Sequence, residues 1–469
     1  MSEKGIRDAR TLGVPKMLLL GFQHMFAMFG ATVLVPALTG LSVSATLLFA
    51  GLGTLLFHLL TKRKVPAFLG SSFAFLGGYA AVRALFEGSN VNWIPYAGAG
   101  VACAGLIYLI LALLFKIFGA NRVMRFFPPI VTGPIIICIG LTFANSALNN
   151  CQSNWWIALL AIVIVVVCNI WGKGMIKIIP ILLGVVGSYI VAAICGQVDF
   201  TAVKEAAWIG VPFNFMKDSV AGLFAQAETV LADGTSQMVS TFDPSLLISS
   251  ILIMVPISLA TMIEHVGDMC AISSTVGENF VADPGLHRSL MGDGVATSVA
   301  ALFGAPANTT YGENTGVLAL TKVYDPKVVR IAAFLAILFS FCPKFAALVS
   351  CMPAATIGGV SLVLYGMISA VGVRNIVENQ VDFTKSRNII IAALIMGLTL
   401  GINFSGNLGA DTVNGISGAI AFNIGRVTIK LSGLAVGALV GIILNAVLPG
   451  NDYQFGKDEK GDKAVNFKV

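Results

Sequence analysis

Charged side chains are scarce in this chain of 469 residues: Asp, Glu, Lys and Arg supply 11% of it, whereas hydrophobic residues supply 57%. A soluble domain carries charge on about 25% of its residues, which coat its surface with groups that water solvates. The scarcity therefore excludes an ordinary water-soluble fold. Apolar segments long enough to cross a hydrocarbon layer of ~30 Å recur along the whole chain, which predicts an all-α polytopic membrane protein.

The chain also lacks the signatures of several functional classes. Its eight cysteines form no CxxC pair and lie mostly within apolar stretches. We interpret them as small buried hydrophobic residues and expect neither a disulfide framework nor a metal site. No HExxH motif or Ser–His–Asp spacing occurs in the apolar segments, which argues against an enzyme. We expect no cofactor and no nucleic-acid partner. The first residues, MSEKGIRDARTLGVPK, contain no apolar core, so we expect no signal peptide.

Fourteen apolar segments are candidates for membrane-spanning helices. They cover residues 15–40, 43–60, 66–86, 95–117, 123–146, 154–171, 174–196, 245–275, 287–305, 308–323, 329–350, 353–372, 386–404 and 430–449.

The basic residues predict how these spans are oriented. With the N-terminus in the cytoplasm, nearly all loops rich in Lys and Arg face the cytoplasm, whereas loop 197–244 carries six acids and two lysines and faces outside. The positive-inside rule describes this distribution. Arg426 and Lys430 fall on the other side against this rule, so the topology of 405–430 stays open. We expect a multi-pass protein of the cytoplasmic (inner) membrane, surrounded by lipid, with both termini cytoplasmic.

The third and tenth segments are too irregular for ordinary spanning helices. They contain the sequences VPAFLGSSFAFLGG (65–78) and FGAPANTTYGENTG (303–316), which are rich in Gly, Pro, Ser, Thr and Asn. Irregular backbone at membrane depth is tolerated only where protein or a polar cavity satisfies its N–H and C=O groups. A pair of interrupted segments in the two halves of a chain predicts the binding site of a transporter.

The two halves of the chain correspond to each other. QHMFAM (23–28) aligns with EHVGDM (264–269), and SSFAF (71–75) aligns with TTYGE (309–313). The two motifs start 48 residues apart in the first half and 45 apart in the second, which indicates an internal duplication. Because each half contains an odd number of spans, the second copy must be inverted in the membrane.

Three acids lie deep in the predicted spans: Glu264, Asp268 and Glu313. An ionisable side chain at the bilayer centre costs about 2.5–3.5 kcal/mol on insertion scales, so several in one fold point to a function. Glu264 and Asp268 are four residues apart and therefore share one face of a helix, where repulsion favours protonation or pairing of one group. The alternative is that the acids satisfy one another structurally, which does not account for Glu313 in an interrupted span.

A neutral planar heterocycle such as a nucleobase fits these groups. Its N–H groups can donate to the carboxylates, and its carbonyls can accept from backbone N–H groups at the start of a half-helix. Phe73 and Tyr311 can supply apolar faces for the ring. The first repeat has Gln23, Ala27 and Phe75 where the second has the three acids, which favours a site with one polar wall.

Two other classes of protein fit less well. An anion exchanger needs uncompensated N–H dipoles or Arg at the two half-helices, and the acids disfavour it. An intramembrane enzyme built on Glu264, His265 and Asp268 is the other alternative, but EHVGD reverses the order of the zinc-protease motif.

The segment ENTGVLALTK (313–322) fits a ten-residue signature: Glu, Gln or Pro, then Asn, any residue, Gly, four residues, Thr, and a basic residue or Gly. In this signature the chain resembles the nucleobase–cation symporter-2 family, also called nucleobase–ascorbate transporters, and within it the branch that transports uracil. The likeness covers roughly residues 15–450. It includes QHMFAMFGATVLVP (23–36), VPAFLGSSFAF (65–75), EHVGDM (264–269), DPGLHRS (283–289), NTTYGEN (308–314) and GGVSLVLYG (358–366).

The resemblance implies a fold of 14 transmembrane spans in two inverted seven-span repeats, with a short strand in each of spans three and ten. It also implies a homodimer. The implied division is a core domain of spans 1–4 (15–117) and 8–11 (245–350), a gate domain of spans 5–7 (118–196) and 12–14 (351–450), an extracellular loop (197–244) and a cytoplasmic tail (451–469).

Carried over residue by residue, the resemblance implies roles for individual side chains. Phe73 and Gly312 would offer backbone N–H groups, and Ser361 and Tyr365 would lie on the gate side. The substrate-binding set would be Glu264, Glu313, Phe73, Gly312, Tyr311, Ala31, Ser361 and Tyr365. The proton-coupling set would be Asp268, Glu264 and Glu313, and the set that orders the core would be Gln23, His24, Asn314 and Thr321.

The activity implied by the resemblance is uracil:proton symport by alternating access. Glu313 favours uracil, because the purine-transporting branch usually has Gln at this position and ascorbate transporters have Pro. A permease of the same family for xanthine, another purine or another pyrimidine is the alternative. Asp268 departs from the pattern of the uracil transporters, which often have His there, so the route of the proton stays open.

Overall fold

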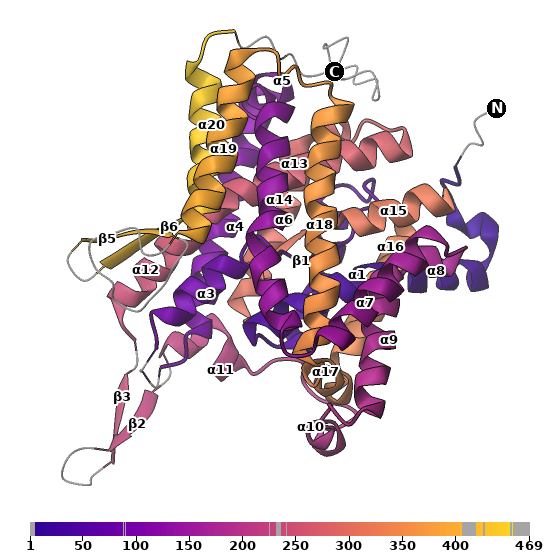
Figure 1. Ribbon diagram of the computed structural model, residues 1–469, viewed down its shortest axis with the longest axis vertical. Coiled ribbons are helices and arrows are strands. Elements are labelled where there is room, and N and C mark those ends of the chain that lie inside the picture. The colour runs from indigo at the N-terminus through magenta and orange to yellow at the C-terminus, as the bar shows by residue number, and fades with distance from the viewer. Residues whose placement is uncertain are drawn as a thin grey trace.

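Within the residues that it describes, the computed structural model is a bundle of helices with three short two-stranded sheets (Figure 1). The described residues are 5–87, 89, 91–224, 226–230, 236–240, 242–405, 419–424, 427–450 and 453. Among them, seven helical segments are long and apolar enough to cross a membrane, or eight if a bent pair counts as one span. The chain is therefore a multi-pass membrane protein.

The helices fall into three groups by length. The seven long segments are α1 (Val14–Thr39), α2 (Val43–Leu60), α4 (Ile94–Phe118), α6 (Pro129–Cys151), α12 (Pro244–Met254) continued by α13 (Ser258–Val276), α18 (Ala354–Glu378) and α19 (Ser386–Phe404). Helices of intermediate length are α3 (Leu76–Ala84), α7 (Trp155–Ile170), α9 (Pro180–Ile194), α14 (Leu286–Leu302), α15 (Gly312–Thr321), α16 (Pro326–Ser340), α17 (Pro343–Ser350) and α20 (Gly433–Val447). The shortest are α5 (Ala120–Met124), α8 (Met175–Ile178), α10 (Thr201–Glu205) and α11 (Phe215–Asp218).

Proline and glycine set many of these boundaries. Pro129, Pro180 and Pro326 occupy first helical positions, where a backbone N–H would lack a helical partner. Gly40 and Gly277 end α1 and α13 with φ of 81° and 72°. Residues with a side chain rarely adopt this left-handed conformation, so these helices stop where a glycine permits the turn.

The interrupted spans three and ten contain the predicted strands, and these strands pair with each other. β1 (Leu69–Ser71) lies antiparallel to β4 (Asn308–Thr310), with Gly70 opposite Thr309, near the middle of the bundle (Figure 1). Both strands are buried along their whole length. The ladder therefore satisfies backbone groups that would otherwise lack partners at membrane depth.

The two halves of the chain pack in matching ways. α2 lies along α16 as α14 lies along α4, and α6 and α18, which are the fifth and twelfth predicted spans, lie side by side. α7 pairs with α9 as α19 pairs with α20. Each contact between two spans thus recurs between the corresponding spans of the other half, the pattern expected of a duplicated chain with an inverted second copy.

Glycines allow the closest of these approaches. A methyl group added at Gly294 of α14 would lie 2.4 Å from Cβ of Tyr108 and 2.6 Å from the carbonyl oxygen of Gly105 on α4. A methyl group at Gly372 of α18 would lie 2.7 Å from the carbonyl oxygen of Gly133 on α6. Small residues let backbones approach closely, and this contact drives association between helices where lipid is as apolar as the side chains.

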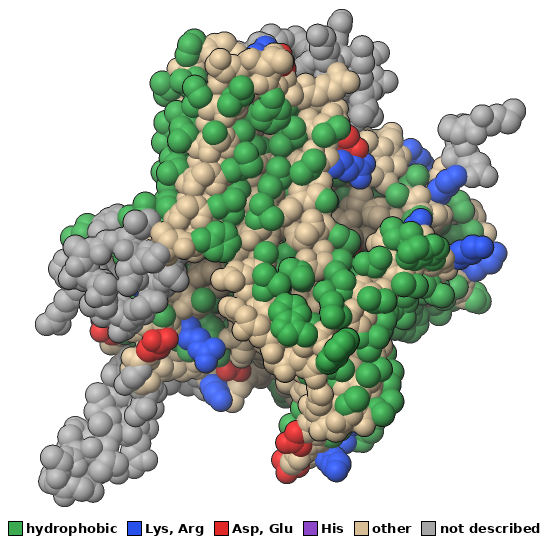
Figure 2. Space-filling view, in the orientation of Figure 1, with side chains coloured by type: hydrophobic (Ala, Val, Ile, Leu, Met, Phe, Trp, Pro, Cys, Tyr) green, Lys and Arg blue, Asp and Glu red, His purple; other side chains and the backbone are tan. Residues whose placement is uncertain are grey.

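Hydrophobic side chains cover the middle of the face shown in Figure 2, whereas Lys, Arg, Asp and Glu gather toward its edges. Exposed hydrophobic side chains of the described residues include Ile110 of α4, Ile170 of α7 and Ile443 of α20. The hairpin of β2 (Gln226–Val230) and β3 (Ser236–Ser240) lies at the opposite end of the molecule from α5 in Figure 1. This arrangement matches a protein whose apolar middle is surrounded by lipid.

Two boundaries differ from the sequence prediction. The single span predicted over 329–350 consists of α16 and α17, bent by 88° where Pro343 starts a new helix. The last span does not begin at residue 430, because Lys430 lies in a hairpin of β5 (Ala419–Ile424) and β6 (Val427–Ser432). The side chain of Ser432 caps α20. The rest of the open segment 405–430, namely 406–418 and 425–426, lies outside the described residues.

Candidate functional site

Two half-helices start at the paired strands and direct their N-termini toward the centre of the molecule. α3 follows β1 after a short turn, and α15 begins at Gly312, two residues after β4 ends. In the described part of the chain, the backbone N–H groups of Phe73 and Gly312 have no hydrogen-bond acceptor. A methyl group added at Gly312 would meet no atom within 4 Å. Unpaired N–H groups beside open space form a site for an acceptor such as a carbonyl oxygen.

The three acids predicted for the site converge at this opening. Glu264 and Asp268 lie one turn apart on α13, and Glu313 lies in the first turn of α15. Glu264 is within electrostatic reach of both Asp268 and Glu313. All three residues are deep in the molecule yet only partly buried, so they border open space.

A fourth acid, Asp293 of α14, is absent from the sequence prediction and is fully buried. His265 Nδ1 lies 3.0 Å from Asp293 Oδ2 and 3.5 Å from Thr310 Oγ1. The Thr310 hydroxyl in turn donates to Asp268 Oδ2 at 2.7 Å. A polar chain thus connects α14, α13 and β4. The signal was in the sequence, since Asp293 interrupts the predicted ninth span.

Aromatic side chains form the apolar part of the site. Phe73 and Tyr311 are both buried, and the Tyr311 hydroxyl donates to the carbonyl oxygen of Ser71 at 2.8 Å, which fixes the ring against β1. The Tyr365 ring of α18 meets Phe73 edge-on at 5.7 Å. The hydroxyls of Tyr365 and Ser361 are near each other, and neither has another hydrogen-bond partner among the described residues. α18 therefore faces the paired strands with two available hydroxyls.

The other predicted residues lie around this centre. Ala31 is fully buried in α1, next to Thr32, whose carbonyl oxygen accepts from Ser71 Oγ at 2.8 Å. The Asn314 amide lies 3.0 Å from the carbonyl oxygen of His24 and 3.1 Å from its Nδ1, which ties α15 to α1.

Gln23 and Thr321 occupy more distant positions. Gln23 is buried in α1, and its Oε1 has no hydrogen-bond partner among the described residues. Thr321 Oγ1 donates to the carbonyl oxygen of Val317 at 2.8 Å, at the end of α15. Neither contacts the acids through a hydrogen bond in the described part of the chain.

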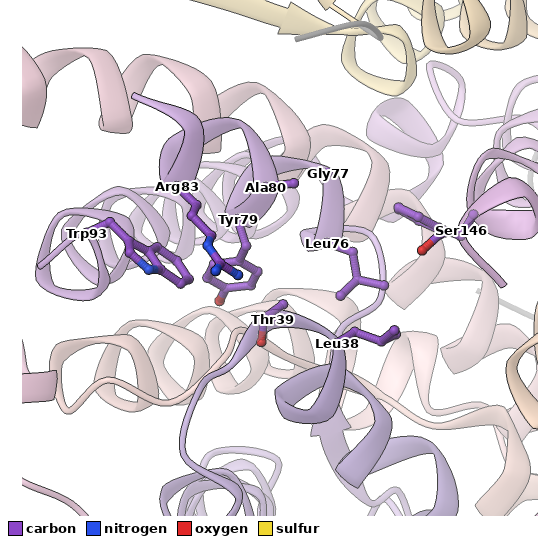
Figure 3. Close-up of a pocket in the computed structure, with 10 residues that line it drawn as sticks. Leu38, Thr39, Leu76, Gly77, Tyr79, Ala80, Arg83, Trp93 and Ser146 are labelled. Atoms are coloured by element: carbon purple, nitrogen blue, oxygen red, sulfur yellow. The ribbon is translucent and has the colours of Figure 1, made fainter. Parts of the chain in front are cut away.

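Cavities lie on both sides of α15. One of about 180 Å³ is bordered by Glu313, Ala27 and Met367. Another of about 160 Å³ is bordered by Asp268 and Thr315. A third, of about 240 Å³, lies beside α3 (Figure 3). Glu313 and Asp268 are therefore accessible to small molecules or water from within the fold.

The amino-acid sequence is similar to those of known transporters. The model of a permease family matches residues 15–407. The chain is 36% identical to the uracil permease of Bacillus subtilis (strain 168), over 99% of this chain and 98% of that protein. It is 38% identical to the uracil permease of Bacillus caldolyticus, over 95% and 94% of the two chains. It is 34% identical to the uracil permease of Escherichia coli (strain K12), over 91% and 90%.

Solved structures share the fold at low identity. The transmembrane domain of BicA, a cyanobacterial bicarbonate transporter, superposes with a TM-score of 0.59 at 15% identity, over 94% of this chain and 99% of that one. SLC26A9 superposes with a TM-score of 0.60 at 12% identity, over 92% of this chain and 64% of that one. These similarities establish the fold alone.

Proposed function

Because this chain belongs to the nucleobase–cation symporter-2 family of permeases, we propose that it imports uracil together with a proton across the cytoplasmic membrane. Three relatives that match at least nine tenths of the chain are uracil permeases. The family and these relatives point to a transporter rather than an enzyme.

One observation supports the substrate most directly: Glu264 and Glu313 converge beside the open first turn of α15. Uracil carries ring N–H groups, which a carboxylate accepts, and carbonyl groups, which accept from the N–H groups of Gly312 and Phe73. The molecule is neutral, so binding it buries no additional charge. We assign Glu264 and Glu313 to hydrogen bonding and the rings of Phe73, Tyr311 and Tyr365 to the flat faces of the base.

The fold by itself also fits an anion transporter, since the solved structures include one for bicarbonate. An anion between ionised Glu264 and Glu313 would meet like charges at short range in a medium of low dielectric, which disfavours it. The acids therefore favour a neutral base over an anion.

For the mechanism, we propose that a core domain moves against a gate domain to expose the site alternately to the two sides. The matching contacts of the two halves support 14 spans in two inverted repeats, with spans 1–4 and 8–11 as the core and spans 5–7 and 12–14 as the gate. The binding groups of Glu264 and Glu313 then belong to the core, and Ser361 and Tyr365 belong to the gate. We further propose that both termini are cytoplasmic, that loop 197–244 is extracellular, and that the protein forms a homodimer.

The proton is assigned to the acids at the site. A loaded carrier that crosses with several ionised carboxylates near the midplane carries an unfavourable charge, which one bound proton reduces. The proton is then released inside with the base. Proton binding and base binding then favour each other, because linkage between two ligands is reciprocal. Asp268, Glu264 and Glu313 are the candidates for this proton.

The test is uptake of radiolabelled uracil by proteoliposomes, with and without an inward proton gradient. We expect accumulation above equilibrium only with the gradient. Xanthine, thymine and adenine compete in parallel reactions, and uptake of radiolabelled xanthine with no uptake of radiolabelled uracil would replace uracil by a purine. Equal uptake with and without the gradient would show that uracil transport is not coupled to the proton.

A further inference from the structure

The cavity beside α3 is separate from the acids. It has a volume of about 240 Å³ and lies between α3, the end of α1, α6 and the chain before α4. Figure 3 shows Trp93, Arg83 and Tyr79 grouped at one end and Ser146 at the other. A methyl group added at Gly77 would meet no atom within 4 Å, so this part of α3 borders open space.

Arg83 is available for a ligand. It lies in the last turn of α3, and its guanidinium makes no ion pair or hydrogen bond among the residues that the structure describes. Glu87, four residues later, is the nearest acid in sequence; it is within electrostatic reach of Lys430 in β6 and forms no ion pair with Arg83 among the described residues. A guanidinium carries five N–H donors in a planar fork, so its donors can bind carbonyl oxygens of a flat ring.

The neighbouring rings are fixed in place. The Tyr79 hydroxyl accepts a hydrogen bond of 3.1 Å from the backbone N–H of Ala307, which anchors Tyr79 to the chain before β4. The Trp93 ring packs edge-on against Tyr79 with centroids 6.5 Å apart. Trp93 is only partly buried, so its ring offers apolar area to a planar molecule.

A cluster of three rings stands between this cavity and the candidate site. Phe143 of α6 borders the cavity and lies 5.8 Å from the Tyr365 ring, which in turn lies 5.7 Å from the Phe73 ring. Along α3, Arg83 is about 10 Å beyond Leu76, at 1.5 Å per residue. A molecule in the cavity is thus one ring layer away from the site, between an element of the proposed core and one of the proposed gate.

We propose that this cavity is an outer docking position for the transported base, a neutral planar ring with carbonyl groups. Arg83 donates to the carbonyl oxygens, and Trp93 contacts one face of the ring. Movement of the Phe73, Tyr365 and Phe143 rings then admits the base to Glu264 and Glu313. This inference rests on the proposed function, because it takes the same substrate.

An Arg and a Trp at the end of a helix also occur as anchors at the membrane surface, where they contact lipid headgroups. Two features favour the docking position over an anchor. Arg83 and Trp93 border one open pocket with Tyr79, and the opposite wall is protein, namely Phe143 and Ser146.

The test measures equilibrium binding of radiolabelled uracil to the full-length protein in lipid nanodiscs. Glu264→Gln removes tight binding at the central site, and we expect a weaker saturable phase to remain. In Glu264→Gln/Arg83→Gln this phase weakens at least 10-fold. Glu264→Gln/Lys204→Gln loses the same charge from α10, at the same end of the molecule but away from the cavity, and retains the phase.

The outcomes separate the two proposals. If wild-type protein binds uracil tightly but Glu264→Gln has no saturable phase, or if Arg83→Gln leaves that phase unchanged, the docking position is overturned and the proposed function stands. If wild-type protein binds no uracil, both are overturned. If Arg83→Gln only lowers the melting temperature in anionic nanodiscs and binds as its parent does, Arg83 is a lipid anchor.

Discussion

The hydroxyl of Thr310 donates a hydrogen bond of 2.7 Å to Oδ2 of Asp268 and so joins the last residue of β4 to the middle of α13. The strand that carries one half-helix is thereby connected to the helix that carries two acids. Any change in the proton or charge of Asp268 acts directly on the position of β4, two residues before the first turn of α15.

Thr310→Val tests this connection. Valine keeps the shape of threonine and removes the donor, and a hydrogen bond to a charged group contributes about 1.5–3 kcal/mol. We expect gradient-driven accumulation of uracil to fall about 10-fold or more, with a smaller effect on exchange of uracil across the membrane. Thr310→Ser, which keeps the hydroxyl, is the control and should retain most of the activity. Equal loss in both variants would show that shape rather than the hydrogen bond matters.

Glu264→Gln and Glu313→Ala are each expected to abolish uracil accumulation. Glu264→Gln keeps the size of the side chain and removes the carboxylate, while Glu313→Ala removes the side chain from the first turn of α15. Size-exclusion profiles and melting temperatures should stay near those of the wild type, because both residues border open space. Full uptake by either variant would remove that residue from the site.

Asp268→Asn is expected to separate binding from coupling. The amide can still accept from Thr310 but cannot release a proton, so binding of uracil survives better than its accumulation against a gradient. The measurement compares equilibrium binding with uptake at several external pH values. Wild-type dependence of uptake on the proton gradient would show that Asp268 has no part in coupling.

Gly294→Ala is expected to destabilise the fold. The added methyl group would overlap Tyr108 and the carbonyl oxygen of Gly105, and such overpacking typically costs about 1–3 kcal/mol. Gly397→Ala on α19 is the matched control, because a methyl group there meets no atom within 4 Å. In a helix it should stabilise by up to about 1 kcal/mol. Melting temperatures of both variants in the same detergent provide the measurement. A decrease for Gly397→Ala with none for Gly294→Ala would contradict the close contact of α14 with α4.

The ion pair of Lys64 and Asp283 gives a test outside the membrane. The ammonium group of Lys64, hydrogen-bonded to the carboxylate, holds the pKa of Asp283 below its usual value. Such a group stabilises the fold above its unfolded pKa of about 4 and loses this effect as pH falls through the lower folded pKa.

Lys64→Gln should therefore melt below the wild type at pH 7, and the difference should disappear toward pH 2. Both side chains are about half exposed or more, at 44% and 63%, so the difference should be at most about 2 °C. A difference that persists unchanged at low pH would indicate that packing, not charge, is lost.

The sequence predicts the membrane class, the two interrupted spans and the three acids Glu264, Asp268 and Glu313, because each leaves a strong local signal, whereas the resemblance to the family implies the two strands. Scarce charge, interrupted apolar segments and acids among apolar residues are visible without a structure. Asp293 also interrupts a span, yet a single acid within Gly and Ala residues gives no sign that His265 lies 3.0 Å away.

Other features depend on contacts between distant parts of the chain. Pro343 lies within segment 329–350 and signals a break in the helix, but the 88° angle between α16 and α17 depends on how the two helices pack. Before Lys430 the chain alternates apolar residues with Asn423, Arg426 and Thr428. The sequence leaves the topology here open, and only the pairing of β5 with β6 places Lys430 in a strand. The cavity at Arg83 arises from four separate elements and leaves no pattern in any of them.

The pairing of β1 with β4 also constrains how the protein is made. Residues 69–71 leave the ribosome long before residues 308–310, their ladder partners, have been synthesised. Until then their backbone groups have no counterpart, and hydrocarbon supplies none. During this time, water or another protein must satisfy the backbone groups of the third span. Its final position in the bilayer is therefore reached only after the tenth span has been translated.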